Sequence, residues 1–321
     1  MSSGNTITSS SRPSVGVVGL GSIGGVVAGL LAALNRYDVV ACVRRPITRL
    51  VVERSEGAVD VPIRALTDPA QAQPVDWVLL CTKTQDTAAS APWLTRLCGE
   101  RTRVATLQNG SGHAERLAPF VGQAGVVPTI VYYNGERLAP DRVRFRRAGA
   151  HEFAVSDDED GQAFAALLDG TAMRVLLSRD FTTLTWRKLL LNAMANPITA
   201  LTLQRQAIFR RQDVKALCLS ILEEAAAVGR ADGAQLAADE PERLLAALLT
   251  YPPDAGTSMY FDRLAGRPLE IEALTGAVVA AGAKYGVPTP LNGMLLTLAR
   301  AAGDGPLPPS MTAPQPQGET G

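Results

Sequence analysis

The chain has 321 residues, which is long enough for two domains with separate hydrophobic cores. Hydrophobic residues make up 46% of the chain and charged residues 19%, which is the ordinary composition of a globular protein. Because 31 basic residues balance 31 acidic ones, the net charge gives no general attraction to nucleic acid, and we expect no nucleic-acid partner.

The N-terminal 13 residues are polar and rich in serine and threonine. They lack the basic-then-apolar order of a signal peptide, and we expect them to be disordered. The next stretch, Ser14 to Asn35, carries no charge and is long enough to cross a bilayer. Glycines interrupt it, however, and it is better interpreted as a strand, a turn and a helix. The sequence therefore predicts no membrane partner.

Residues 14–180 alternate between strand and helix patterns. Short apolar runs predict buried strands at Val15–Val18, Asp38–Val43, Trp77–Cys81, Val104–Leu107 and Val126–Val131. Helices are expected after the first strand, through about Leu34, and at Thr84–Leu97. Such alternation predicts an α/β domain with a doubly wound parallel sheet of the Rossmann type.

From residue 181 the pattern is almost wholly helical, which predicts an all-α domain over residues 181–302. The expected helices are Thr182–Leu203 with a kink at Pro197, Asp213–Ala231, Pro241–Leu249, Ser258–Leu264, Leu269–Tyr285 and Leu291–Ala302. Their apolar faces would allow a homodimer. The Pro/Gly-rich residues 303–321 are expected to form a disordered tail.

The cysteines and histidines do not predict a metal site. Four scattered cysteines match no metal-ligand spacing, and two histidines are too few for a His-rich site; the cysteines are Cys42, Cys81, Cys98 and Cys218. Three of the cysteines lie in apolar stretches, which indicates buried, reduced thiols. This fits a cytoplasmic protein.

A GxGxxG motif follows the first predicted strand and opens the first helix. It consists of Gly19, Leu20, Gly21, Ser22, Ile23 and Gly24. The first glycine allows a tight turn, the second lets the backbone approach a pyrophosphate, and the third permits close helix–strand packing. The helix N-terminus then presents free N–H groups to the phosphates. The alternative is a glycine-rich turn that serves packing alone.

The second predicted strand ends in Arg44-Arg45-Pro46, where an NAD enzyme usually has an acidic residue. A guanidinium can bind a 2′-phosphate through charge-assisted hydrogen bonds, which favours NADP(H), with Arg44 as the first candidate. The alternative is that both arginines form a solvated edge.

Three further segments carry polar residues where ligands are expected. Lys83, in Cys-Thr-Lys, and Asn109, in Leu-Gln-Asn-Gly, follow the carboxyl ends of predicted strands. In the long helix, Lys188, Asn192 and Asn196 recur every four residues and share one face. Apolar neighbours argue against the alternative, a stripe that faces water, so these groups need binding partners.

In these motifs the chain resembles the ketopantoate reductase family over residues 14 to 302. The resemblance rests on GLGSIG, CTK, LQNG, WRKLLLNAMANPITAL, Ser258-Met259, Glu270-Ile271-Glu272 and the closing KYGVPTP. It implies reduction of 2-dehydropantoate to pantoate in pantothenate synthesis, with NADPH as the hydride donor.

The resemblance also implies roles for individual residues. Lys188 is the expected general acid, and Glu270 is expected to orient the substrate and the lysine. Substrate binding is expected of Asn109, Asn192, Asn196 and Ser258. Asn109 and Lys83 are also expected beside the nicotinamide. The role of Asp262, which matches an acidic position of the family, is open.

Some of these residues have structural alternatives. Ser258 could be a helix N-cap, Asn109 could be a turn residue before Gly110, and Glu270 and Glu272 could be first-turn acids of a helix led by Pro268. His113 is interpreted as a surface-loop residue.

Several positions depart from the family pattern. They are Leu269, Thr275, Ser111, His113 and the stretch Tyr132-Tyr133-Asn134, which would give an unusually aromatic wall. The departures at Leu269 and Thr275 leave open the same chemistry on another small 2-oxo acid or carbonyl compound. A non-catalytic NADP-binding sensor is a separate alternative, against which the intact Lys188, Asn192, Ser258 and Glu270 argue.

Overall fold

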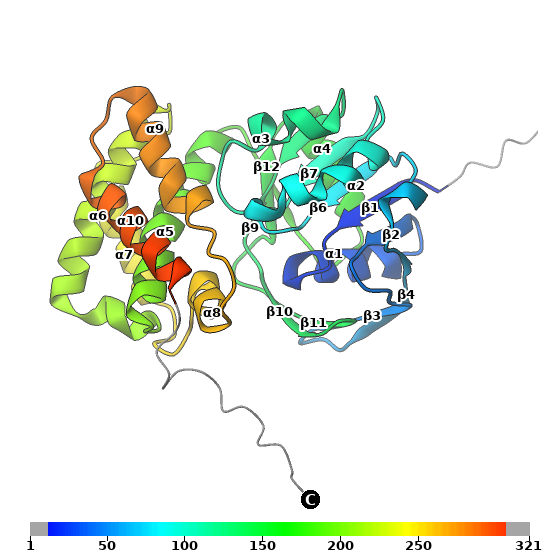
Figure 1. The fold of residues 1–321 in the computed structure, drawn as a ribbon, viewed down its shortest axis with the longest axis horizontal. Coiled ribbons are helices and arrows are strands. Elements are labelled where there is room, and N and C mark those ends of the chain that lie inside the picture. Colours follow the sequence, from blue (N-terminus) through cyan, green and yellow to red (C-terminus); the bar gives the residue numbers. More distant parts are fainter. Residues whose placement is uncertain (1–11, 306–321) are drawn as a thin grey trace, which may run out of the picture. The chain divides into compact units, whose positions relative to one another are not determined.

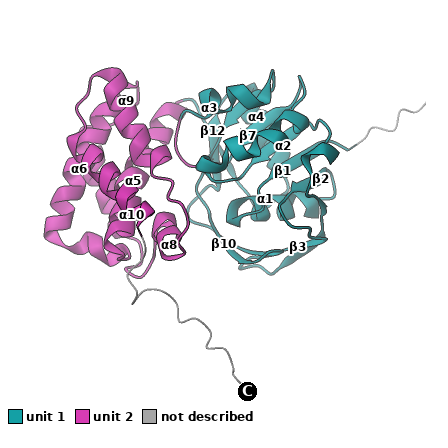
Figure 2. Cartoon of the chain, viewed as in Figure 1, with its two compact units in different colours: residues 1–108, 112–179 teal, residues 109–111, 180–321 magenta. Residues whose placement is uncertain are grey.

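The computed structural model describes residues 12–305, and these divide into two compact units. Unit 1 comprises the residues up to 108 together with 112–179, and unit 2 comprises 109–111 together with the residues from 180 onward (Figure 2). Apart from residues 12–13 and 303–305, the ends that were expected to be disordered lie outside the described residues.

Unit 1 is built on a six-stranded sheet in which all neighbouring strands are parallel (Figure 1). In sheet order the strands are β5 (Arg64–Leu66), β2 (Asp38–Cys42), β1 (Ser14–Val18), β6 (Trp77–Leu80), β7 (Arg103–Thr106) and β8 (Gly125–Pro128). The four central strands are the apolar runs that the sequence predicts as buried strands. Such runs suit a parallel sheet because helices cover both of its faces.

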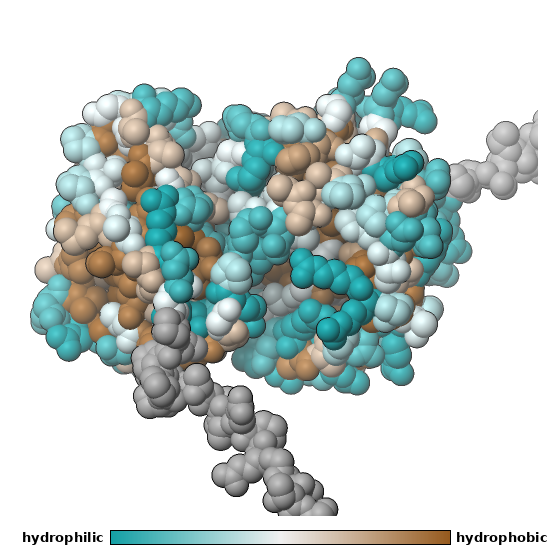
Figure 3. Space-filling view, in the orientation of Figure 1, coloured by the Kyte–Doolittle hydropathy of each residue, from teal (hydrophilic) through white to brown (hydrophobic). Residues whose placement is uncertain are grey.

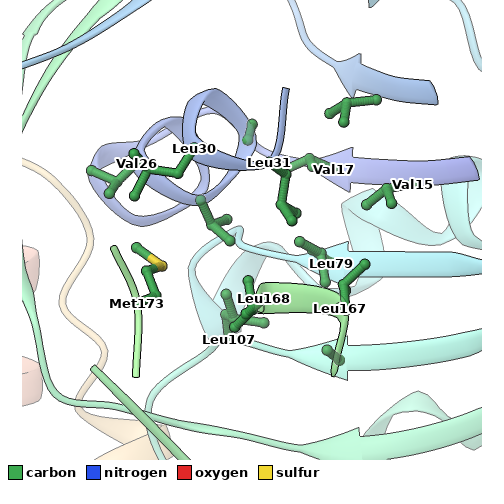
Figure 4. Close-up of a cluster of buried hydrophobic side chains, with 14 of the residues drawn as sticks. Val15, Val17, Val26, Leu30, Leu31, Leu79, Leu107, Leu167, Leu168 and Met173 are labelled. Carbon is green, nitrogen blue, oxygen red and sulfur yellow. The ribbon is translucent and has the colours of Figure 1, made fainter. Parts of the chain in front are cut away.

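Alternate residues of these strands enter two different cores. Val15 and Val17 of β1 pack into one hydrophobic cluster, and Val18 packs into another. Figure 4 shows the first cluster, where the α1 side chains Val26, Leu30 and Leu31 lie with strand residues and with Leu168 of α4. The helices of this unit are α1 (Ser22–Ala33), α2 (Ala91–Leu97), α3 (His113–Val121) and α4 (Glu159–Leu168). Residues 84–90, which were expected to be α-helical, form two 3-10 turns instead.

Two smaller sheets in unit 1 are not predicted by the sequence analysis. One has the order β10 (Asn134–Ala139), β11 (Arg142–Arg146), β3 (Arg49–Glu53), β4 (Val59–Pro62), and the other has the order β13 (Val175–Ser178), β12 (Phe153–Ser156), β9 (Ile130–Val131). Helix α1 packs against the first of them. Gly29 of α1 permits this contact, because a Cβ there would lie 2.4 Å from Cγ2 of Val52. The single strand expected at Val126–Val131 is wrong, since β8 and β9 belong to different sheets.

Unit 2 is helical. Its helices are α5 (Phe181–Thr202), α6 (Gln212–Ala231), α7 (Glu240–Leu249), α8 (Ser258–Leu264), α9 (Ala277–Tyr285) and α10 (Pro290–Asp304). The helix expected at Leu269–Tyr285 begins later, with a π-helical segment η5 (Glu272–Gly276) that leads into α9. Helix α10 continues two residues beyond its expected end. The predicted fold class, a Rossmann-type doubly wound sheet followed by an all-α domain, is confirmed.

The uncharged stretch from residue 14 to residue 35 forms β1, a turn and α1, as predicted. None of the helices between residues 12 and 305 combines the length and apolarity that a bilayer crossing requires.

Candidate active site

The glycine-rich turn after β1 has the geometry that each glycine of the motif requires. Gly19 has φ +93, a conformation that favours glycine, and its N–H donates to the carbonyl of Cys42 at 3.2 Å. A Cβ at Gly24 would lie 1.9 Å from the Gly19 oxygen, so only glycine allows this approach of helix to strand. A Cβ at Gly21 would meet no protein atom within 4 Å. The backbone at Gly21 is therefore open to a ligand.

The N-terminus of α1 lies directly behind this turn. No side chain caps it, so its first N–H groups are left for an anion, and the helix dipole favours negative charge there. Leu20 is buried, whereas Ser22 and Ile23 are half-buried. These residues fit the pyrophosphate of a dinucleotide.

Arg44 and Arg45 follow β2 and are both exposed. The strand ends at Cys42, one residue earlier than predicted, but the Val43 N–H still donates to the carbonyl of Leu66 at 2.9 Å. Within residues 12–305, neither arginine has an ion-pair partner, so both guanidinium groups can bind a phosphate.

A buried glutamine, which the sequence analysis does not single out, joins two of the strand ends. Gln108, after β7, is 5% exposed, and its Nε2 donates to the carbonyl oxygens of Thr82 and Lys83 at 3.1 and 3.3 Å. It also bonds to the hydroxyl of Thr87. These bonds fix the backbone that carries Lys83. The available signal was an amide residue at the end of a buried strand.

In unit 2, the predicted polar face of α5 is partly enclosed. Lys188 and Asn192 are half-buried, and Asn196 is only 5% exposed. Leu189, Leu190, Ala193 and Met194 on the same turns are buried in the core of the unit. Burial lowers the pKa of the Lys188 ammonium group from 10.5 to about 8. The alternative interpretation, in which this face of α5 is a stripe that faces water, is therefore wrong for Asn196.

Asn109 and Glu270, which are 161 residues apart in sequence, meet in this unit. Nδ2 of Asn109 donates to Oε2 of Glu270 at 3.4 Å, and the glutamate is 5% exposed. Gly110 makes the approach possible: its φ is +97, and a Cβ there would lie 2.4 Å from the carbonyl oxygen of Ala273. Glu270 precedes the helical segment η5, so it is not a first-turn acid of that helix, whereas Glu272 is.

Ser258 is the first residue of α8 and is exposed. The cap of α8 is Thr257, whose Oγ1 accepts from the Tyr260 N–H at 3.1 Å, so the interpretation of Ser258 as an N-cap is wrong. The Thr257 hydroxyl also lies 2.6 Å from the hydroxyl of Thr199 on α5. This buried pair, which sequence reasoning missed, fixes the start of α8 against α5.

Two other sequence interpretations are corrected in unit 1. His113 is not a surface-loop residue: it is the first residue of α3, only 7% exposed, and its Nδ1 lies 2.5 Å from Nη2 of Arg116. Tyr133, expected to contribute to an aromatic wall, is buried in the core of unit 1: its ring packs against Phe145 and Phe153, and its hydroxyl donates to the carbonyl of Ile23 at 2.8 Å.

Asp262, whose role was open, has a structural partner. It is buried on α8, and its Oδ1 accepts from Nε of Arg267 at 2.9 Å. Between residues 12 and 305, no cluster of three or more histidine, cysteine or acidic residues is placed to hold a metal ion.

Comparison with known proteins gives the family. A family model described as "Ketopantoate reductase PanE/ApbA" matches residues 15–158, and one described as "Ketopantoate reductase PanE/ApbA C terminal" matches residues 180–303. The 2-dehydropantoate 2-reductase of Caulobacter vibrioides is 40% identical over 292 residues, which cover 90% of this chain and 99% of that protein.

Solved structures agree. The PanE/ApbA family ketopantoate reductase of Ralstonia eutropha matches with a TM-score of 0.81 at 30% identity, covering 91% of this chain and 98% of that chain. The dimeric ketopantoate reductase of Staphylococcus aureus matches with a TM-score of 0.79 at 25% identity, covering 90% and 98%. The family resemblance read from the motifs is thereby confirmed: the chain belongs to the ketopantoate reductase family of oxidoreductases.

Proposed function

We propose that this chain reduces 2-dehydropantoate to pantoate with NADPH, with Lys188 as the general acid. The observation that carries the proposal is the enclosed face of α5, where the lysine has two asparagines one and two turns further along. The curated relative from Caulobacter vibrioides is named for this reaction.

The proposed chemistry needs a proton donor beside the substrate carbonyl. When bound, NADPH supplies the hydride that reaches the carbonyl carbon. Negative charge then develops on the carbonyl oxygen, where the Lys188 ammonium stabilises it and donates one proton to complete the alcohol. A pKa of about 8 suits this role, because the group is mostly protonated at neutral pH and yet gives up its proton readily.

The other side chains of unit 2 are proposed to hold the substrate. Asn192 and Asn196 would donate amide hydrogen bonds to its oxygens, and exposed Ser258 would contact its carboxylate. Glu270 would orient the substrate and the lysine, with Asn109 donating to that carboxylate. The alternative substrate class, another small 2-oxo acid, would use the same groups, because they recognise the shared carboxylate and ketone.

NADPH is proposed over NADH because of Arg44. An exposed guanidinium two residues after the end of β2 suits a 2′-phosphate, and no carboxylate stands at that strand end. The open backbone at Gly21 and the uncapped start of α1 suit the pyrophosphate. Lys83, at the carboxyl end of β6, is proposed to lie near the nicotinamide.

The Lys188→Ala variant tests the proposal against a non-catalytic sensor. We expect turnover to fall by about 10²–10⁴-fold, while the affinity for NADPH in a fluorescence titration stays within about twofold. The Lys215→Ala variant, which removes a half-buried lysine from α6, is the matched control and should keep full turnover. Full turnover by Lys188→Ala would exclude the general-acid role.

We also propose that the chain forms a homodimer, as the similar reductase of Staphylococcus aureus does. Hydrophobic residues gather on the face of unit 2 seen in Figure 3. On α10, Met294 and Leu298 lie one helical turn apart and are 60% and 52% exposed. Exposed apolar residues that gather in one contiguous patch are typical of a protein–protein contact.

A further inference from the structure

One backbone carbonyl of helix α5, next to the polar residues, lacks its usual hydrogen-bond donor. The helix runs through Pro197 without a break, and proline has no N–H to donate to the carbonyl four residues earlier. That carbonyl belongs to Ala193, which lies between Asn192 and Asn196 and is fully buried. A buried carbonyl without a donor is costly, so Ala193 needs a partner from outside the helix.

Thr275 supplies this partner. Its Oγ1 donates to the Ala193 carbonyl at 2.8 Å, and its side chain is 0% exposed. Thr275 is one of the positions at which the chain departs from the family pattern. Because its hydroxyl bonds to the backbone of α5, the threonine at this position serves the helix and does not indicate a different substrate.

The segment that carries Thr275 also leads away from Glu270. Residues 272–276 form the π-helical segment η5, in which the Gly276 N–H donates to the carbonyl of Ile271 at 2.9 Å. Such single π-turns are frequent at functional sites. The Gly110 backbone packs against Ala273 of the same segment. One short segment therefore contacts the turn after Asn109, begins two residues after Glu270, and bonds to the turn of α5 that holds the asparagines.

We propose that Thr275 is a positioning residue. Its hydroxyl replaces the N–H that Pro197 lacks, and this bond fixes the position of Glu270 and of the following segment η5 relative to Asn192 and Asn196. This inference rests on the proposed function, because it assigns those residues to substrate and proton transfer. Thr275 itself does not touch the reacting atoms.

The test compares two substitutions in purified full-length protein with NADPH and ketopantoate. Thr275→Val keeps the volume but removes the donor, and Thr275→Ser keeps the donor. We expect kcat/KM to fall about tenfold or more in Thr275→Val, with both a higher KM and a lower kcat, and to stay within about threefold of the unaltered protein in Thr275→Ser. Equal kcat/KM in Thr275→Val and the unaltered protein would overturn the inference.

Pro197→Ala gives an independent readout, because alanine restores an N–H that can reach Ala193. In that background Thr275→Val should reduce kcat/KM by about threefold or less, so the two changes are coupled. An unchanged effect of Thr275→Val in that background would show that the hydroxyl does not act through Ala193, and would overturn the inference. If Thr275→Val alone does not fold, Thr275→Ser and the Pro197→Ala double variant still decide the question.

A stability control separates positioning from general damage. Thr102, in unit 1, is also buried, and its Oγ1 donates to the Val75 carbonyl at 2.6 Å. Thr102→Val should lower the melting temperature and leave kcat/KM within about twofold. A loss of kcat/KM in Thr102→Val equal to that in Thr275→Val would overturn the inference. If the unaltered protein reduces no 2-oxo acid, the proposed function itself fails, and the inference falls with it.

Discussion

At Lys188, burial lowers the pKa of the ammonium group to about 8, which gives the proposed reaction a defined pH dependence. With Lys188 as the proposed general acid, reduction needs the protonated form, so kcat/KM should be flat at lower pH and fall about tenfold per pH unit above that pKa. In the reverse direction, with pantoate and NADP, the neutral amine is the base and the rate should rise through the same pH. Initial rates measured in both directions across the pH range check this.

The control for the pH profile is Lys188→Arg. A guanidinium keeps the charge but does not deprotonate in this range, so its weak residual activity should show no falling limb near pH 8. If kcat/KM of Lys188→Arg fell over the same pH range as that of the unaltered protein, the ionisation would belong to another group, which would contradict the role of Lys188.

At Arg44, the proposed preference for NADPH depends on a single exposed guanidinium. Arg44→Ala should raise the KM for NADPH by about tenfold to a hundredfold, because a charge-assisted pair with a phosphate is lost, while the KM for NADH barely changes. The neighbouring Arg45→Ala is the matched control and should have the smaller effect. Steady-state kinetics with both cofactors measure the difference. A larger effect of Arg45→Ala would move the phosphate site to Arg45.

Among the elements, the turn between β1 and α1 contains one glycine that the fold requires, Gly24, and one that is expected to serve cofactor binding, Gly21. A methyl group at Gly24 collides with the Gly19 carbonyl, so Gly24→Ala should lower the melting temperature markedly. A methyl group at Gly21 meets no protein atom, so Gly21→Ala should melt near the unaltered protein and yet bind NADPH at least about tenfold more weakly. Thermal melts and NADPH titrations check both variants. Unchanged NADPH affinity in Gly21→Ala would mean that the pyrophosphate does not approach this turn.

The elements also show which parts of the fold can be predicted from local sequence. The central strands of the large sheet were predictable because each is a continuous apolar run, and the polar face of α5 was predictable from its spacing. The small sheets were not, because β11 pairs with β3, some 90 residues away in the chain, and their strands are short and partly exposed. Strand pairings over such separations leave no local pattern.

The contacts within the candidate site were predictable only in part. The sequence placed Asn109 and Glu270 among the site residues, but not the hydrogen bond between them, which spans 161 residues. Thr257 and Ser258 are adjacent and both can cap a helix, so local pattern could not decide between them; the buried contact of Thr257 with Thr199 does. The hydroxyl of Thr275 could not be paired with Ala193 without the fold.

For the whole molecule, the proposed homodimer predicts a definite mass in solution. Light scattering should give a mass of about twice the 33.8 kDa of one chain. Met294→Lys combined with Leu298→Lys should shift the protein to the monomer, because each change places a charge in the apolar contact. Leu138→Lys, at an exposed leucine of unit 1, should leave the dimer intact. A monomer in the unaltered protein would contradict the proposed dimer without affecting the proposed chemistry.

The most direct test of the central claim is NADPH oxidation by the unaltered protein with ketopantoate, beside pyruvate, 2-oxoisovalerate and bulkier 2-oxo acids, each repeated with NADH. The account predicts the highest kcat/KM for ketopantoate with NADPH, and at least about tenfold less with NADH. Turnover confined to another 2-oxo acid would contradict the substrate while leaving the Lys188 mechanism in place. Tight NADPH binding without turnover of any of these acids would contradict the account and favour a non-catalytic sensor.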